Sequence, residues 1–197
     1  MAENVDDVAA YLLERRGAMR TARLQKLVYY AQAWHLADHR EHLFEDDIEA
    51  WMNGPVVRRL YDRHRGRREA SGWPAGDPRR LGPRARDAVE RILRSYGPLP
   101  EGELSRIVRT EPPWRLARAG RLVARRSAKV IDPTVMADYY GRLRTSPEVA
   151  VVVAVGSARL EGHEFGPYMV DRLREAAAGT RAADDIIAEM IVQYGTS

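Results

Sequence analysis

The strongest constraint on the fold is a helical pattern that begins at Thr21 and continues past Trp34. Its apolar residues recur every three or four positions, and Tyr30 and Trp34 widen the stripe that they form. An apolar face of this width is typical of a helix that other elements surround. The sequence therefore predicts a mainly helical domain around this segment, with Thr21 as its cap. The stripe consists of Leu24, Leu27, Val28, Ala31 and His35.

Weaker helical patterns flank this central segment. They run from Val5 to Leu12 with a stop at Gly17, from Pro83 to Gly97, from Leu99 to Val108, and from Asp132-Pro133 through Leu143. Proline at the first position and an aspartate before it are typical helix starts. We expect Pro112-Pro113 to break the chain.

Two short apolar stretches, Ile48–Trp51 and Val130-Ile131, predict strands that pair with each other as a small two-stranded β element. Asn53-Gly54-Pro55 predicts a turn after the first strand, and Val56–His64 predicts a helix. The segment Gly66–Pro83 is rich in Gly, Pro and Arg, which predicts an exposed loop.

Composition excludes several classes of protein. The chain has no cysteine, which excludes disulfides and thiolate catalysis. It has no run of 18 apolar residues and no apolar leader, so we expect a cytoplasmic protein without a membrane partner. His35 and His39 share a helix spacing, but nothing completes a metal site around them. We expect no metal, no cofactor and no enzymatic activity.

The charge balance is basic, with a net charge of +4, and all but two of the 32 basic residues are arginine. Arginine is densest between Arg58 and Arg68. A basic surface is a common feature of nucleic-acid-binding proteins, so operator DNA is a candidate partner.

A second segment follows a boundary near Thr145-Ser146, and its composition turns valine-rich. We expect residues 146–197 to form three helices. Val149, Val152 and Val153 share one side of the first helix with Leu160, and Gly156 lies in the middle of that side. Glycine there lets another backbone approach closely. Three short helices cannot bury so apolar a face alone, so a partner or the first domain must cover it.

Several motifs of the first 145 residues occur together. Arg23–His35 is followed by Ile48–Trp51, then by Gly54-Pro55 and Tyr61, and finally by Glu111-Pro112-Pro113-Trp114. Together they resemble the Panacea, or SocA-like, antitoxin domain, from about residue 3 to 145. The resemblance implies a helical domain with a small β element that neutralises toxins by direct contact and has no enzymatic activity. The motif residues here are Lys26, Tyr29, Tyr30, Trp34, His35, Trp51, Gly54, Pro55, Tyr61 and Trp114.

Whether these aromatic residues are core residues or contact residues stays open at this point. Lys26 is one of only two lysines and lies on an apolar helix, which suggests a salt bridge or a partner contact.

The second segment carries Ser157-x-x-x-Glu161-Gly162, the pattern of the inhibitory motif of Fic enzymes. Most of residues 146–195 resemble the small VbhA-type antitoxins, which pair in trans with Fic toxins. The resemblance implies that Glu161 binds the toxin arginine that holds the ATP γ-phosphate, and that Ser157 adds a hydrogen bond. Arg159 and Leu160 complete the motif.

The sequence therefore predicts a two-domain antitoxin, with a Panacea domain at 1–145 and a VbhA-like Fic-inhibitory module at 146–197. It would bind a Fic-domain AMP transferase and prevent productive ATP binding. Two alternatives stay open: a Panacea antitoxin against a toxin of another class, with the second segment as a docking or dimerisation module, and a DNA-binding autoregulator.

Overall fold

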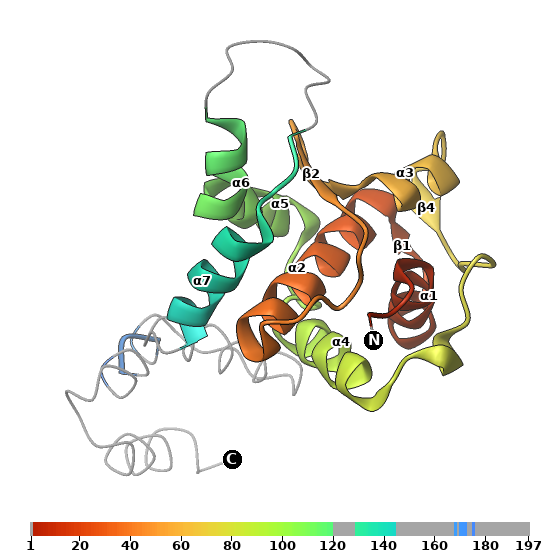
Figure 1. Ribbon diagram of the computed structural model, residues 1–197, viewed down its shortest axis with the longest axis horizontal. Coiled ribbons are helices and arrows are strands. Elements are labelled where there is room, and N and C mark those ends of the chain that lie inside the picture. The colour runs from red at the N-terminus through yellow and green to blue at the C-terminus, as the bar shows by residue number, and fades with distance from the viewer. Residues whose placement is uncertain (1, 120–128, 145–167, 169, 173–174, 176–197) are drawn as a thin grey trace. The chain divides into compact units, whose positions relative to one another are not determined.

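The N-terminal part of the chain folds around helix α2 (Thr21–His39), which lies at the centre of its unit in Figure 1. The computed structural model describes residues 2–119, 129–144, 168, 170–172 and 175. The chain divides into two units, Met1–Gly141 and Arg142–Ser197. The domain boundary predicted near residue 145 stays a prediction, and the predicted three-helix module lies outside the described residues apart from 168, 170–172 and 175.

The width of its apolar stripe correctly predicted the central position of α2. Helices α1 (Val5–Arg16), α4 (Pro83–Ser95) and α5 (Glu101–Thr110) all pack against it. Thr21, however, is not its cap, because the helix already begins after Arg20. The Thr21 hydroxyl instead donates to the carbonyl oxygen of Arg67, at 3.2 Å, where the chain returns from a later segment.

The remaining helices begin and end for local reasons. Asn4 caps α1 by accepting a hydrogen bond from the backbone N–H of Asp6 at 3.0 Å, and Gly17 ends it with φ 81°. Pro83 opens α4, as predicted. Helix α7 (Pro133–Arg144) begins where the Asp132 carboxylate accepts from the N–H of Thr134 at 2.7 Å.

We expected Pro112-Pro113 to break the chain, but in the structure these two residues open helix α6 (Pro112–Arg118). The first residues of a helix need no backbone donor, so proline fits there.

The predicted fold class is confirmed for the described residues: they are mainly helical and contain two small two-stranded antiparallel sheets. Strands β2 (Ile48–Trp51) and β3 (Gly54–Val57) form a hairpin. The turn and helix predicted at 53–57 were therefore placed wrongly, and helix α3 (Arg58–His64) begins only after β3. The second sheet, β1 (Met19–Arg20) with β4 (Glu69–Ala70), was not predicted.

The predicted pairing of Val130 with the first strand is confirmed as an isolated bridge to Glu49. The N–H of Ala50 donates to the carbonyl oxygen of Lys129, and that of Ile131 donates to Ile48, each at 2.8 Å. Residues 129–131 thus extend the hairpin at its free edge.

Most of the segment 66–83 is exposed, as its composition predicts, but it is not a plain loop. It contains β4 and the short 3₁₀ helix η1 (Pro78–Arg80), and it buries Ala70, Trp73 and Leu81. No helix in the described ranges is both long and apolar enough to cross a membrane.

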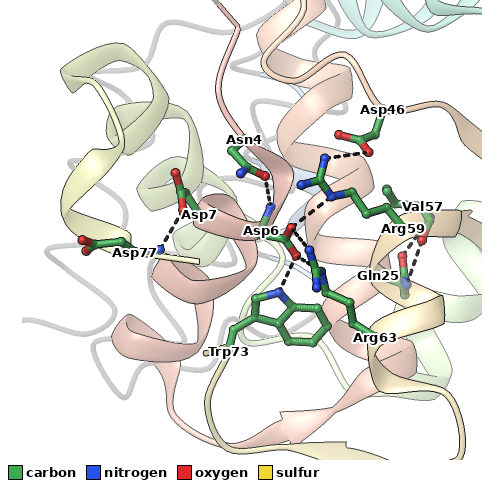
Figure 2. A network of polar contacts seen from close by, with 10 residues as sticks. All are labelled: Asn4, Asp6, Asp7, Gln25, Asp46, Val57, Arg59, Arg63, Trp73 and Asp77. Atoms are coloured by element: carbon green, nitrogen blue, oxygen red, sulfur yellow. Dashed lines mark hydrogen bonds and ion pairs between the residues drawn. The ribbon is translucent and has the colours of Figure 1, made fainter. Parts of the chain in front are cut away.

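A buried carboxylate, that of Asp6, ties this segment and α3 to the start of α1. In Figure 2 the side chains of Arg59, Arg63 and Trp73 converge on it. The Nε atoms of Arg59 and Arg63 lie 3.0 and 2.7 Å from its oxygens, and the indole Nε1 of Trp73 donates at 2.8 Å. Three side chains from two segments therefore depend on one acidic side chain.

Candidate functional site

The aromatic residues that the central helix contributes to the motif lie in the core. Tyr29 and Tyr30 are completely buried, and Trp34 and His35 are each 7% exposed. The ring of Tyr30 stacks on Tyr96 with 3.9 Å between the ring centroids. The structure therefore places these four side chains in or at the edge of the core, where they are buried.

A buried acid, Glu111, lies at the centre of this aromatic cluster. Its Oε2 accepts hydrogen bonds from the hydroxyl groups of Tyr140, at 2.7 Å, and Tyr30, at 3.2 Å. The hydroxyl of Tyr29 lies 3.2 Å from that of Tyr140. Burial raises the pKa of Glu111 to about 7, against the opposing effect of the two tyrosine donors. Glu111 precedes α6, so the network joins α2, α6 and α7.

No separate sequence signal indicated the role of Glu111, which was predicted only as part of the Glu-Pro-Pro-Trp motif. The burial of Glu111 depends on Tyr140, 29 residues further along the chain, and local patterns carry no information about that contact.

Lys26 is also buried, with 3% of its surface exposed, so it is not a surface contact residue. Its ammonium group donates to the carbonyl oxygen of Ala22 at 3.0 Å, and burial lowers its pKa. The chain bends over it at Gly54, where φ is 120°. A side chain at Gly54 would be strained in that conformation and would contact the Lys26 side chain at 3.5 Å.

The hairpin, by contrast, presents one face to solvent. Alternate residues of its strands are buried, whereas Glu49, Trp51 and Val56 between them are only half-buried. Val130 pairs with Glu49 and lies on the same face. Helix α3 follows the hairpin directly and adds Tyr61, whose ring centroid is 4.6 Å from that of Trp51.

We define the hairpin face as Trp51, Met52, Val56, Arg58, Tyr61 and Val130. Met52, in the hairpin turn, is 51% exposed, and Val130 is 40% exposed. The guanidinium carbon of Arg58 lies 5.9 Å from the ring centroid of Trp51 and 6.0 Å from that of Tyr61. The face thus combines aromatic rings, an arginine and a methionine, which are residue types enriched in protein interfaces, with two valines.

Trp114 lies at the border of the hairpin face and holds its backbone. Its indole Nε1 donates to the carbonyl oxygen of Trp51 at 3.0 Å, and the guanidinium of Arg118 lies 5.3 Å from its ring centroid. Arg118 also donates to the carbonyl oxygen of Ala50 at 3.0 Å. The structure therefore brings together three predicted motif residues, Trp51, Tyr61 and Trp114. Gly54 and Pro55 form the start of β3 beside them.

Half of the arginines between Arg58 and Arg68 form ion pairs within the fold. Arg59 and Arg63 bind the buried Asp6, and Arg58 forms an ion pair with Asp62 at 3.1 Å. Arginines that neutralise carboxylates of their own chain contribute less to an electrostatic site for DNA. The stretch is therefore a weaker nucleic-acid signal than its composition suggests.

His35 and His39 pack on each other, with 4.6 Å between their ring centroids. His35 borders a surface pocket with residues of 41–45 and 82–85, and burial and the neighbouring His39 lower its pKa to about 4. Within the described ranges, no group of three or more His, Cys, Asp or Glu side chains could hold a metal ion. The predicted residues of the second segment lie outside the described residues: Val149, Val152, Val153, Gly156, Ser157, Arg159, Leu160, Glu161 and Gly162.

Comparison with known proteins identifies one segment. Residues 24–115 match the family model described as antitoxin SocA-like, Panacea domain. The match begins in α2 and ends in α6, so it includes the hairpin, α3 and Glu111. No curated protein and no solved structure shows significant similarity to the chain. An antitoxin family points to a regulatory protein with a toxin as its partner. The chain therefore contains a SocA-like Panacea antitoxin domain at residues 24–115, which supports an antitoxin role in a toxin–antitoxin pair.

Proposed function

We propose that the protein is the antitoxin of a Fic-domain AMP transferase and that its second segment prevents productive ATP binding by that toxin. The proposal depends on the combination of two features in one chain. The Panacea domain at 24–115 supplies the antitoxin class. Ser157-x-x-x-Glu161-Gly162, at the end of the apolar stretch Pro147–Gly156, supplies the class of toxin. The single observation that carries the Fic assignment is this motif behind an antitoxin domain.

The proposed mechanism requires no chemistry from the antitoxin. In a helix, Ser157 and Glu161 lie one turn apart on one face. The Glu161 carboxylate would form a charge-assisted pair with the toxin arginine that holds the ATP γ-phosphate. ATP could then bind only with misplaced phosphates, so attack on its α-phosphate fails. The valine side of the helix, with Gly156 at its centre, would dock against the toxin.

A toxin of another class and a DNA-binding autoregulator are the alternatives. The ion pairs of Arg58, Arg59 and Arg63 within the fold lower the weight of the DNA alternative. Binding to a promoter fragment that weakens steeply with salt would support it.

The test is co-expression with the toxin encoded in the adjacent reading frame, with growth and AMP transfer as the two measurements. We expect Glu161→Gly to restore AMP transfer and toxicity while the two proteins still co-purify. Glu164→Gly removes a nearby carboxylate outside the motif and should protect as well as the parent chain. If Glu161→Gly also protects fully, Glu161 does not cause the inhibition. If the neighbour lacks AMP transfer activity, the Fic assignment is wrong.

A further inference from the structure

We infer that the hairpin face is the surface by which the Panacea domain contacts its toxin, and that it fits an apolar toxin segment flanked by carboxylates. The inference rests on the antitoxin role proposed above but does not depend on the toxin being a Fic enzyme. It assigns a binding surface to the N-terminal unit, whereas the proposed inhibition belongs to residues 146–197.

The exposed apolar side chains of the hairpin face support this assignment. Only four large hydrophobic side chains in the described part of the chain are exposed, and two of them, Met52 and Val130, lie on this face. Trp51, Val56 and Tyr61 add half-buried apolar surface between them. Contiguous apolar surface bordered by polar groups is typical of binding sites.

The contacts that hold Trp51 in place also support this assignment. The indole Nε1 of Trp51 donates to the Glu49 carboxylate at 2.5 Å, its ring packs on Tyr61, and its carbonyl oxygen accepts from Trp114. An aromatic side chain fixed in this way loses little conformational entropy when a partner binds. Tryptophan, tyrosine and arginine are also the residues that most often dominate binding energy.

The charge around the face indicates the chemistry of the partner. Its two carboxylates already have partners, because Glu49 accepts from the Trp51 indole and Asp62 pairs with Arg58. Arg58 is already paired with Asp62, so the cations that remain near the face are Arg118 and the exposed Lys129, which precedes Val130 in the chain. The cations outnumber the carboxylates, so a partner with carboxylates beside its apolar residues is complementary.

The experiment changes the two most exposed side chains of the face in both charge directions. Met52→Glu and Val130→Glu place a carboxylate opposite the proposed acidic segment, whereas Met52→Arg and Val130→Arg keep the sign of the face. Arg94→Glu, an exposed change on α4, alters the net charge more and serves as a control for remote charge. Each full-length variant is checked by tryptophan fluorescence during urea unfolding, and its affinity for the purified toxin from the adjacent gene is measured by calorimetry.

We expect each glutamate variant to raise Kd about tenfold or more, each arginine variant to change it less than about threefold, and Arg94→Glu to leave it unchanged. Affinities within about threefold for all folded variants would exclude the hairpin face as the toxin contact. Equal weakening by glutamate and arginine would exclude an acidic partner. A wild-type dimer that Met52→Glu dissociates would make the face a contact between two copies.

The result also separates this inference from the proposed function. If the parent chain does not bind the toxin, the antitoxin role itself is wrong. If the parent chain binds and inhibits the toxin, and the hairpin-face variants bind it equally well, the proposed function stands and the surface is wrongly assigned.

Discussion

The buried Glu111 makes the stability of the N-terminal unit depend on pH in a way that one substitution can remove. Glu111→Gln keeps an oxygen that accepts hydrogen bonds from Tyr30 and Tyr140 but cannot ionise. Because burial raises the pKa of Glu111, the folded protein holds this proton more tightly than the unfolded chain does. Its contribution to stability is therefore fully present at low pH and is lost as the pH rises through about 7.

The magnitude follows from the two pKa values. The pKa rises from an ordinary value of 4.5 to about 7 on folding, and one pKa unit corresponds to about 1.4 kcal/mol. Between pH 4.5 and about pH 8, ionisation of Glu111 should therefore reduce the free energy of unfolding by about 3 kcal/mol. The variant lacks this loss, so its stability relative to the wild type should increase by that amount over the same range.

Urea unfolding followed by tryptophan fluorescence measures this directly, because all four tryptophans, Trp34, Trp51, Trp73 and Trp114, lie in the N-terminal unit. Glu103→Gln, on the neighbouring helix α5, removes a carboxylate that lies outside the network and is the matched control. A constant difference between Glu111→Gln and the wild type from pH 4.5 to pH 8 would refute the burial argument.

Two further substitutions test the stability of the fold, and two others test toxin binding and the inhibition of AMP transfer. Asp6→Ala leaves Arg59, Arg63 and Trp73 without their common acceptor, so we expect urea unfolding to show a free energy of unfolding lower by about 3–5 kcal/mol. Asp62→Ala removes an exposed ion pair and should lower it by less than about 1 kcal/mol, and equal losses would contradict the role of Asp6. Gly54→Ala should lower the melting temperature, because it adds about 1–3 kcal/mol of backbone strain. Gly102→Ala, which has open space around it in helix α5, should raise the melting temperature slightly. A higher melting temperature for Gly54→Ala than for Gly102→Ala would show that Gly54 is unstrained. Met52→Glu should weaken toxin binding about tenfold in calorimetry, more than Met52→Arg does. Glu161→Gly should release AMP transfer without loss of the complex, as seen by co-purification.

Helices were predictable because their signals are local. The spacing of the apolar residues predicted the central position of α2. Gly17 predicted the end of α1, and Pro83 and Asp132 predicted the starts of α4 and α7. The hairpin was misplaced because Gly54-Pro55 reads as a turn. The edge of β3 is satisfied by a side chain: the amide of Gln25 accepts from the N–H of Val57 at 2.9 Å and donates to its carbonyl oxygen at 3.3 Å. Such a contact, 32 residues apart, leaves no periodic pattern.

The polar networks were missed for the same reason. Asp6 reads as an ordinary acid in the first turn of a helix, and its partners come from α3 and from a segment that looks like a solvated loop. The motif residues were found as a set, but only the structure separates Tyr29, Tyr30 and Trp34 in the core from Trp51 and Tyr61 on the surface. Local patterns indicate which residues belong to a family motif but do not tell which of them a partner can reach.

The most direct test of the proposed function is the rate of AMP transfer by the purified toxin as the full-length antitoxin is added in increasing amounts. We expect AMP transfer to stop near an equimolar ratio with the parent chain and to continue with Glu161→Gly, although both chains form the complex. Full inhibition by the Glu161→Gly chain, or undiminished AMP transfer by the toxin in complex with the parent chain, would contradict the proposed function.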